Sequence, residues 1–213
     1  MNSNKQTYLK RYISLERLRN ILNSNCLDFN DPESWDDDND IASVKAFRWL
    51  KSKDMAKQIK VGAICFAKGS ELVHHWNSYA KDGCCITFNE VELFKEIIHK
   101  PNFLCGYMNY KTNEELDEYL KKQGTDKIPF IKRKPYECEK EYRVIWFGTG
   151  KLPKLRFKRT AIGRVLLSSE LKNREQIQEE LKKKYRGIKI ELSRLTGSEP
   201  WISKFDNLCN TVL

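Results

Sequence analysis

Three glutamates at alternate positions, Glu137, Glu139 and Glu141, are the residues whose types and spacing most strongly indicate chemistry in this sequence. Along a β-strand, alternate side chains share one face, and three like charges on one face destabilise an ordinary sheet. Such crowding raises the pKa values of the carboxyl groups or requires a cationic partner. Because local violations of this kind concentrate at functional sites, the segment predicts a functional site built on carboxylates.

The same segment also has a structural interpretation, as a group of ion pairs. The bases that could neutralise the glutamates at a solvent-exposed start of a strand are Lys132, Arg133, Lys134, Lys140 and Arg143. The sequence leaves both interpretations open.

An anionic partner is a further expectation, because the chain is basic. It holds 39 Lys and Arg against 29 Asp and Glu, a net charge of +10, which favours nucleic acids, nucleotides or phosphates as partners. Residues 132–159 hold ten bases and three acids, with aromatic residues between them that could stack on bases. The candidate anion-binding residues are Lys132, Arg133, Lys134, Arg143, Lys154, Arg156 and Lys158. A polarised, solvated surface is the alternative.

The elements that must position these residues alternate irregularly between strands and helices. Strands are expected at residues 8–14, 26–29, 61–67, 84–88, 103–110, 141–147, 155–158, 163–167 and 188–192. Helices are expected after Ser14, at residues 40–58, 71–80, 90–99 and 112–122, and from Ser169 to Tyr185. This order predicts a single α+β domain over residues 1–213, with a curved, mostly antiparallel sheet and flanking helices.

Composition narrows the class of protein. Hydrophobic residues make up 40% and charged residues 32% of the chain, which is typical of a globular domain. Without a signal peptide or an apolar run of about 20 residues, a cytoplasmic location and no membrane partner are expected. The seven cysteines are an odd number without C-x-x-C spacing, so neither disulfides nor structural zinc are expected. No other metal site is expected, because adjacent His74 and His75 point apart on a helix.

Several stretches, taken in order, resemble the bacterial domain-of-unknown-function 2971 family over nearly the whole chain. They are residues 8–22, Leu27-x-Phe29, Ser34-Trp35-Asp36-Asp37-x-x-Asp40, Cys65-Phe66-Ala67, Trp76-x-x-Tyr79-Ala80, Gly83-x-Cys85-Ile86-x-Phe88 and Tyr136-x-x-Glu139-Lys140-Glu141-Tyr142-Arg143-Val144-Ile145. The order and spacing of these stretches carry the resemblance, although Tyr142 stands where the family usually has Trp.

More distantly, the order of the stretches is similar to that of the ADP-ribosyltransferase superfamily, which includes DNA-modifying toxins and poly(ADP-ribose) polymerases. In that superfamily a first strand carries a basic or His residue, and the catalytic Glu begins a strand reading Glu-Tyr-x-Val. The corresponding stretches here are Lys10-Arg11, Cys65-Phe66-Ala67, Ser78-Tyr79 and Glu141-Tyr142-Arg143-Val144. The resemblance implies an ADP-ribosyltransferase-like fold, NAD as a substrate, a protein or nucleic-acid acceptor and no metal.

The resemblance also implies a role for each site residue. Glu141 would stabilise the oxocarbenium-like ribose as nicotinamide leaves, and Glu139 would position or deprotonate the acceptor. Lys10 or Arg11 would hold the diphosphate, and the sequence leaves open which of the two faces the site. The aromatic residues that would stack on the nicotinamide are Tyr12, Phe66 and Tyr79.

Two other classes of function remain open at this point. One is a nucleic-acid-binding module that uses the basic residues of 132–159. The other is an inactive interaction domain, of a phage-defence or toxin–antitoxin system. The enzyme hypothesis requires residues from 8–14, 65–80 and 139–141 to converge on one cleft.

Overall fold

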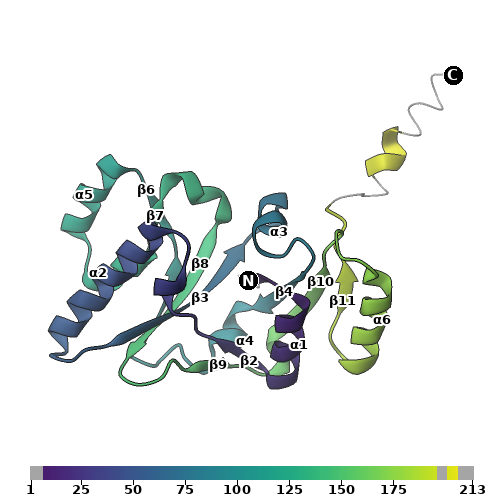
Figure 1. Cartoon of the computed structure of the whole chain (residues 1–213), viewed down its shortest axis with the longest axis horizontal. Coiled ribbons are helices and arrows are strands. Elements are labelled where there is room, and N and C mark those ends of the chain that lie inside the picture. Colours follow the sequence, from purple (N-terminus) through teal and green to yellow (C-terminus); the bar gives the residue numbers. More distant parts are fainter. Residues whose placement is uncertain (1–6, 196–200, 206–213) are drawn as a thin grey trace, which may run out of the picture.

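The computed structural model describes residues 7–195 and 201–205 (Figure 1). The strands of its large sheet are β1 (Tyr8–Ile13), β3 (Lys60–Lys68), β4 (Cys84–Asn89), β5 (Phe103–Tyr107), β8 (Glu141–Gly148), β10 (Ile162–Leu167) and β11 (Ile190–Leu192). Two small sheets pair β2 (Cys26–Asp28) with β9 (Lys154–Arg156) and β6 (Asn109–Lys111) with β7 (Ile131–Arg133). The α-helices are α1 (Leu15–Ser24), α2 (Asp38–Asp54), α3 (Val73–Tyr79), α4 (Glu90–Phe94), α5 (Asn113–Lys122) and α6 (Arg174–Lys184). The 3-10 helices are η1 (Pro32–Ser34), η2 (Thr125–Phe130), η3 (Lys134–Glu139) and η4 (Arg159–Ala161).

The large sheet has seven strands in the order β11-β10-β4-β1-β3-β8-β5. Neighbouring strands are antiparallel except β10 and β11, which are parallel. Figure 1 shows α2 and α5 at one end of the molecule and α6 at the other. The fold is therefore α+β with a mostly antiparallel sheet and flanking helices, as the sequence predicts.

Alternate residues of each strand define two different faces of the sheet. One face carries Phe66 and Val144 and forms the main hydrophobic core with residues of α1, α4 and α6. The other face carries two smaller hydrophobic clusters, one around Phe47 of α2 and one around Trp76 of α3. Glu141 lies on this second face, which is polar between the two clusters.

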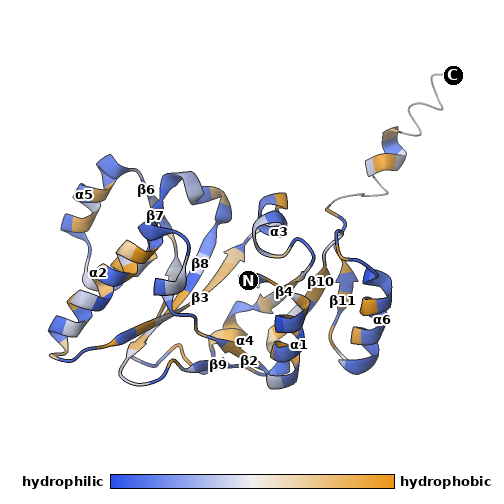
Figure 2. Ribbon diagram, viewed as in Figure 1, coloured by the Kyte–Doolittle hydropathy of each residue, from blue (hydrophilic) through white to orange (hydrophobic). Residues whose placement is uncertain are grey.

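Hydropathy follows this arrangement. Figure 2 shows hydrophobic residues concentrated in the strands of the large sheet, whereas α5 is mostly hydrophilic, and α5 has no buried residue. None of the helices in residues 7–195 and 201–205 has the length and apolar character needed to cross a bilayer.

Local sequence signals explain where α1 begins and ends. The Ser14 hydroxyl accepts a hydrogen bond from the Arg17 N–H at 3.3 Å, as expected of an N-cap. The helix stops at Asn25, whose φ of 51° is left-handed. The buried face of the helix consists of Leu18, Ile21 and Leu22.

Two expected helices differ from those observed. The helix expected from Ser169 begins only at Arg174, because the Ser168 hydroxyl accepts the Glu170 N–H at 3.1 Å and starts a turn instead. The helix expected over 90–99 ends at Phe94, and its remaining residues form turns. Both differences arise in short segments in which turn hydrogen bonds compete with the helix.

Candidate functional site

A group of five charged side chains is buried on the second face of the large sheet. Each is at most 9% exposed: Asp40, Lys132, Glu139, Glu141 and Arg143. Three carboxylates face two cations, so the formal net charge of the group is −1. We call these five residues the charge cluster.

Glu141, the first residue of β8, is held by both cations of the charge cluster. Arg143 donates from Nε to Glu141 Oε1 at 2.8 Å and from Nη2 to Oε2 at 3.1 Å, and Lys132 Nζ donates to Oε2 at 3.3 Å. Burial alone would raise the pKa of Glu141, but the charge and hydrogen bonds of Arg143, together with Lys132, lower this pKa to about 2. Glu141 is therefore ionised, and both of its oxygens are engaged inside the cluster.

Arg143 is the most deeply buried member, at 1% exposure. Besides Glu141, it donates to Asp40 Oδ2 at 3.3 Å and to the Pro129 carbonyl at 3.0 Å, and its guanidinium lies 4.7 Å from the centre of the Trp35 ring. Burial would lower the pKa of Arg143, but the charges around it, chiefly that of Glu141, raise it. The prediction that Arg143 binds an external anion is therefore wrong, because its donors are engaged in the interior.

Lys132 is excluded from the predicted anion-binding surface for the same reason. Its Nζ contacts Glu139 Oε2 at 2.6 Å and Asp40 Oδ2 at 3.0 Å, in addition to Glu141. Burial would lower the pKa of Lys132, but Glu141 and Asp40 raise it above its usual value. The Lys132 ammonium thus joins all three carboxylates of the charge cluster.

The three glutamates do not share one face of a strand, contrary to the sequence prediction. Helix η3 runs to Glu139, and Lys140 then adopts a left-handed φ of 46°, so that β8 begins only at Glu141. Glu137 is exposed and pairs with Lys134 at 3.0 Å. The left-handed residue interrupts the alternation of side chains, and Glu139 and Glu141 meet only through Lys132. The bases that neutralise them act in a buried site, not at a solvent-exposed strand start.

Glu139 is as deeply buried as Glu141 but has fewer hydrogen-bond partners. The Tyr79 hydroxyl donates to Glu139 Oε1 at 3.1 Å, and Tyr79 itself is 52% exposed. Among the described residues each Glu139 oxygen therefore has one hydrogen-bond partner, Tyr79 or Lys132, although a carboxylate accepts about four hydrogen bonds. Burial raises the pKa of Tyr79, and the neighbouring Glu139 charge raises it further, so the hydroxyl keeps its proton.

His75 joins α3 to the main chain of Glu139. Its Nε2 lies 2.9 Å from the carbonyl oxygen of Glu139, and because a carbonyl only accepts, Nε2 carries the proton. The buried Nδ1 has no hydrogen-bond partner among the described residues. Burial lowers the pKa of His75, so the ring is neutral and Nδ1 has a lone pair that is buried.

Strand register decides which base of β1 faces this site. Lys10 pairs with Ala67, and Ala67 pairs with Glu141, so the three residues share one face of the sheet. The buried Lys10 donates to the carbonyl of Gly69, and burial lowers the pKa of Lys10. Lys10 is therefore the base that faces the site.

Arg11 and Phe66, which the sequence assigns to the cofactor, lie on the opposite face. The Arg11 Nη1 donates to the Cys65 carbonyl at 2.8 Å, and its guanidinium lies 5.8 Å from the centre of the Phe66 ring. Phe66 itself packs in the main core. Alternate side chains of β1 and β3 point to opposite faces of the sheet. Arg11 and Phe66 therefore do not lie on the face that carries the charge cluster, and both assignments are corrected.

Tyr12 and Tyr79 flank His75 on the site face. The ring centres of Tyr12 and Tyr79 lie 5.1 Å and 6.4 Å from that of His75. Residues from 8–14, 65–80 and 139–141 thus converge, although they are far apart in the sequence. A hollow of about 340 Å³ includes Glu141 in its lining but none of Tyr12, His75 and Tyr79. Its full lining consists of Lys68, Gly69, Tyr107, Met108, Tyr110, Lys140 and Glu141.

The remaining predicted anion-binding residues lie at the surface. Lys134 pairs with Glu137, Lys154 pairs with Asp28 at 2.8 Å, and Arg133 is exposed. Arg156 and Lys158 are exposed and line a separate hollow. The basic segment is thus divided between an interior part and a surface part.

The described residues hold no group of three or more His, Cys, Asp or Glu placed to bind a metal. Six cysteines are free in this part of the chain, and Cys209 lies outside it.

Sequence reasoning missed two members of the site, Asp40 and His75. Asp40 closes the stretch Ser34-Trp35-Asp36-Asp37-x-x-Asp40 that carries the family resemblance, but the resemblance assigns it no role in the site, and it meets Arg143 across 103 residues of sequence. His75 meets Glu139 across 64 residues. No local signal marks either contact. Comparisons with protein-family models, curated proteins and solved structures find no match to this chain.

Proposed function

We propose that this chain is an ADP-ribosyltransferase-like enzyme that cleaves NAD and transfers ADP-ribose to a protein or nucleic-acid acceptor. The observation that carries the proposal is the position of Lys10 and His75 on the sheet face that also holds the buried charge cluster, which includes Glu139 and has a formal net charge of −1. A negative group in a site that excludes water favours a developing positive charge. The distant resemblance to the ADP-ribosyltransferase superfamily points to the same chemistry and the same fold.

In the proposed reaction the glycosidic bond between ribose C1′ and the nicotinamide nitrogen breaks, and nicotinamide leaves with the electron pair. The positive charge then lies on the ribose ring until an oxygen or nitrogen of the acceptor bonds to C1′. The acceptor loses its proton to a carboxylate as this bond forms. Every step uses residues of this chain and the two substrates, without a metal.

The two glutamates differ in how they can serve this reaction. Both Glu141 oxygens are engaged by Arg143 and Lys132, whereas the Glu139 oxygens keep open acceptor positions under the exposed ring of Tyr79. We assign Glu139 to the ligand and acceptor, and Glu141 to holding Lys132 and Arg143, of which Lys132 in turn holds Glu139 in place. This assignment reverses the relative weight that the sequence gives the two residues.

The other site residues match parts of NAD. Lys10 would pair with the diphosphate after leaving the Gly69 carbonyl, and its burial strengthens such a charge-assisted bond. Tyr79 and Tyr12 would pack on the nicotinamide ring. The free Nδ1 of His75 would accept an N–H from the carboxamide.

The direct test measures binding of NAD and release of nicotinamide by the wild type, Glu139→Gln and Glu137→Gln. Glu137 is the matched control, because it lies two residues away in η3 but pairs with Lys134 at the surface. Glu139→Gln is expected to lower the release rate about 10²–10³-fold, whereas Glu137→Gln is expected to leave it unchanged. Thermal melts of both variants exclude unfolding as the cause.

The proposal fails if the wild type neither binds nor cleaves NAD with protein and nucleic-acid acceptors present. It also fails if a folded Glu139→Gln variant releases nicotinamide at the wild-type rate.

A further inference from the structure

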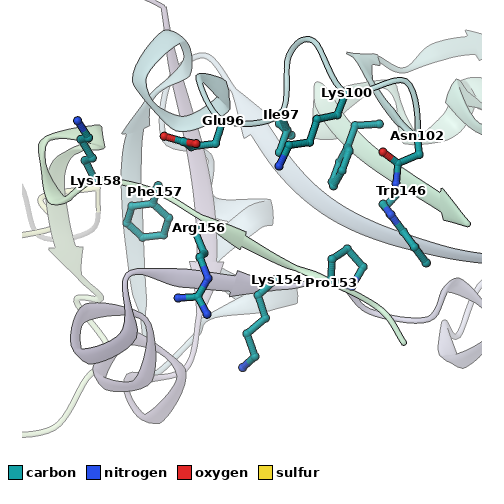
Figure 3. A pocket seen from close by; sticks show the side chains of 11 residues that line it. Glu96, Ile97, Lys100, Asn102, Trp146, Pro153, Lys154, Arg156, Phe157 and Lys158 are labelled. Carbon is teal, nitrogen blue, oxygen red and sulfur yellow. The ribbon is translucent and has the colours of Figure 1, made fainter. Parts of the chain in front are cut away.

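A second hollow, of about 540 Å³, lies apart from the charge cluster (Figure 3). The segment after α4 forms one side of it, and β9 with the residues that follow forms the other. The full lining consists of Glu96, Ile97, Lys100, Asn102, Phe103, Trp146, Pro153, Lys154, Arg156, Phe157 and Lys158. Figure 3 shows the two segments on opposite sides of the hollow, with Trp146 and Phe157 toward its ends. We call this hollow the basic groove.

The rim of the basic groove is strongly cationic. Lys154, Arg156 and Lys158 alternate along an extended segment, and Lys100 adds a fourth cation from the other side. Glu96 is the single acid in the lining. Lys154 pairs with Asp28, but both side chains are more than half exposed, so this ion pair is weak.

The spacing of these cations indicates a polymer and not a small anion. At about 3.3 Å per residue, an extended segment from Lys154 to Lys158 spans about 13 Å. This length exceeds a single phosphate and covers several successive phosphates of an extended strand. The cations therefore match a repeating anionic backbone.

The floor of the groove is apolar. Phe103 and Pro153 are its half-buried members, whereas Ile97, Trp146 and Phe157 are buried. Lys100 Nζ lies 6.0 Å from the centre of the Phe103 ring. Unpaired bases can pack against Phe103 and Pro153 while their phosphates contact the rim. A duplex keeps its bases stacked inside and presents only phosphates, so the floor favours single strands.

We propose that the basic groove binds single-stranded nucleic acid. Trp146 shares the core face of β8 with Val144, whereas Glu141 lies on the other face. The groove is thus independent of the proposed NAD site, and each proposal can fail without the other. The basic groove takes the place of the anion-binding surface that the sequence predicts over residues 132–159. Lys132 and Arg143 do not belong to the groove, because both are buried.

The test measures fluorescence anisotropy of a labelled 12-nucleotide oligothymidine from 50 to 300 mM KCl. Single strands give a slope of log affinity against log salt of about −0.7 per phosphate contacted, so four cations predict a slope of about −3. The triple variant Lys100→Glu, Arg156→Glu and Lys158→Glu is expected to bind at least about tenfold more weakly, with a slope nearer to −1.

A matched control separates the groove from the overall charge. The triple variant Lys45→Glu, Lys57→Glu and Lys127→Glu changes the net charge equally, from +10 to +4, at exposed lysines in and near α2 and η2. Its affinity is expected to stay within about threefold of the wild type. Thermal melts show whether both variants are folded.

A second comparison tests the apolar floor in the unaltered protein. An abasic oligonucleotide of the same length keeps the phosphates and is expected to bind about fivefold more weakly, at the lower end of stacking effects. Equal affinity for the abasic strand or for inorganic polyphosphate would overturn the nucleic-acid proposal in favour of a general polyanion site. So would an equal loss in the control variant, or no binding by the wild type at 50 mM KCl.

Discussion

Replacement of Glu141 by Gln removes one carboxylate from the charge cluster and keeps the shape of the side chain. The glutamine oxygen can still accept one N–H from Arg143, but the amide group on the other side donates and therefore faces a cation. Lys132 and Arg143 Nη2 each lose a partner, at 3.3 Å and 3.1 Å in the wild type. Breaking one side of a buried ion pair costs about 3–5 kcal/mol.

The cost for Glu141→Gln should fall near the lower end of that range, at about 3 kcal/mol. In the variant, Asp40 still contacts both cations. The formal net charge of the cluster changes from −1 to 0. For a chain of 213 residues, a loss of about 3 kcal/mol corresponds to a Tm lower by about 6–12 °C.

Thermal and urea unfolding at pH 7 measure this effect, with Glu137→Gln as the control. Glu137 is exposed and pairs with the exposed Lys134, so the change in its free energy of unfolding should stay within about 0.5 kcal/mol. A Glu141→Gln variant with a Tm within about 2 °C of the wild type would refute the reasoning, since the carboxylate would then not hold the two cations.

The same variant separates the roles of the two glutamates. At a temperature at which both variants are folded, Glu139→Gln is expected to slow nicotinamide release more than Glu141→Gln does. The reverse order would restore Glu141 as the residue that contacts the ribose, as the sequence alone suggests.

Three further predictions follow from the described contacts. The pKa of Glu141 is about 2 in the folded chain against an ordinary 4.5. The ionised Glu141 therefore contributes stability above about pH 4.5, and this contribution is lost as the pH falls toward 2. The wild-type Tm should fall over this window more steeply than the Tm of Glu141→Gln. Lys10→Met should raise the KM for NAD at least about tenfold with little change in kcat, measured by nicotinamide release, and an unchanged KM would remove Lys10 from the diphosphate site. Gly83→Ala should cost about 3 kcal/mol in urea unfolding, since its Cβ would meet the Ile13 carbonyl oxygen at 2.2 Å, whereas Gly124→Ala, with no atom within 4 Å of its Cβ, should be nearly neutral.

Most of the elements could be predicted from local patterns. The apolar run of β3 and the Gly-bounded run of β8 give strands close to those observed, because extended backbone suits β-branched and aromatic residues. Ser14 marks the start of α1 for an equally local reason, a hydroxyl within reach of the first free N–H groups. These signals need only neighbouring residues, and the sequence contains them in full.

The site could be predicted only in part. The sequence places Glu139, Glu141, Lys10 and Tyr79 in one candidate site, and the structure brings them to one face of the sheet. The sequence could not show whether Lys10 or Arg11 faces the site, because a shift of one residue in strand register exchanges the two faces of the sheet. That choice depends on the pairing of β1 with β3.

The sequence by itself determined how many charges the chain carries, but not which of them are buried. Composition gave a basic α+β domain, and residues 132–159 gave a cationic segment. Only the tertiary structure divided that segment, with Lys132 and Arg143 in the buried charge cluster and Arg156 and Lys158 on the rim of the basic groove. The physical reason is that a charge is placed inside only where distant partners meet it. The contact of Arg143 with Asp40 spans 103 residues, a distance over which local sequence carries no signal.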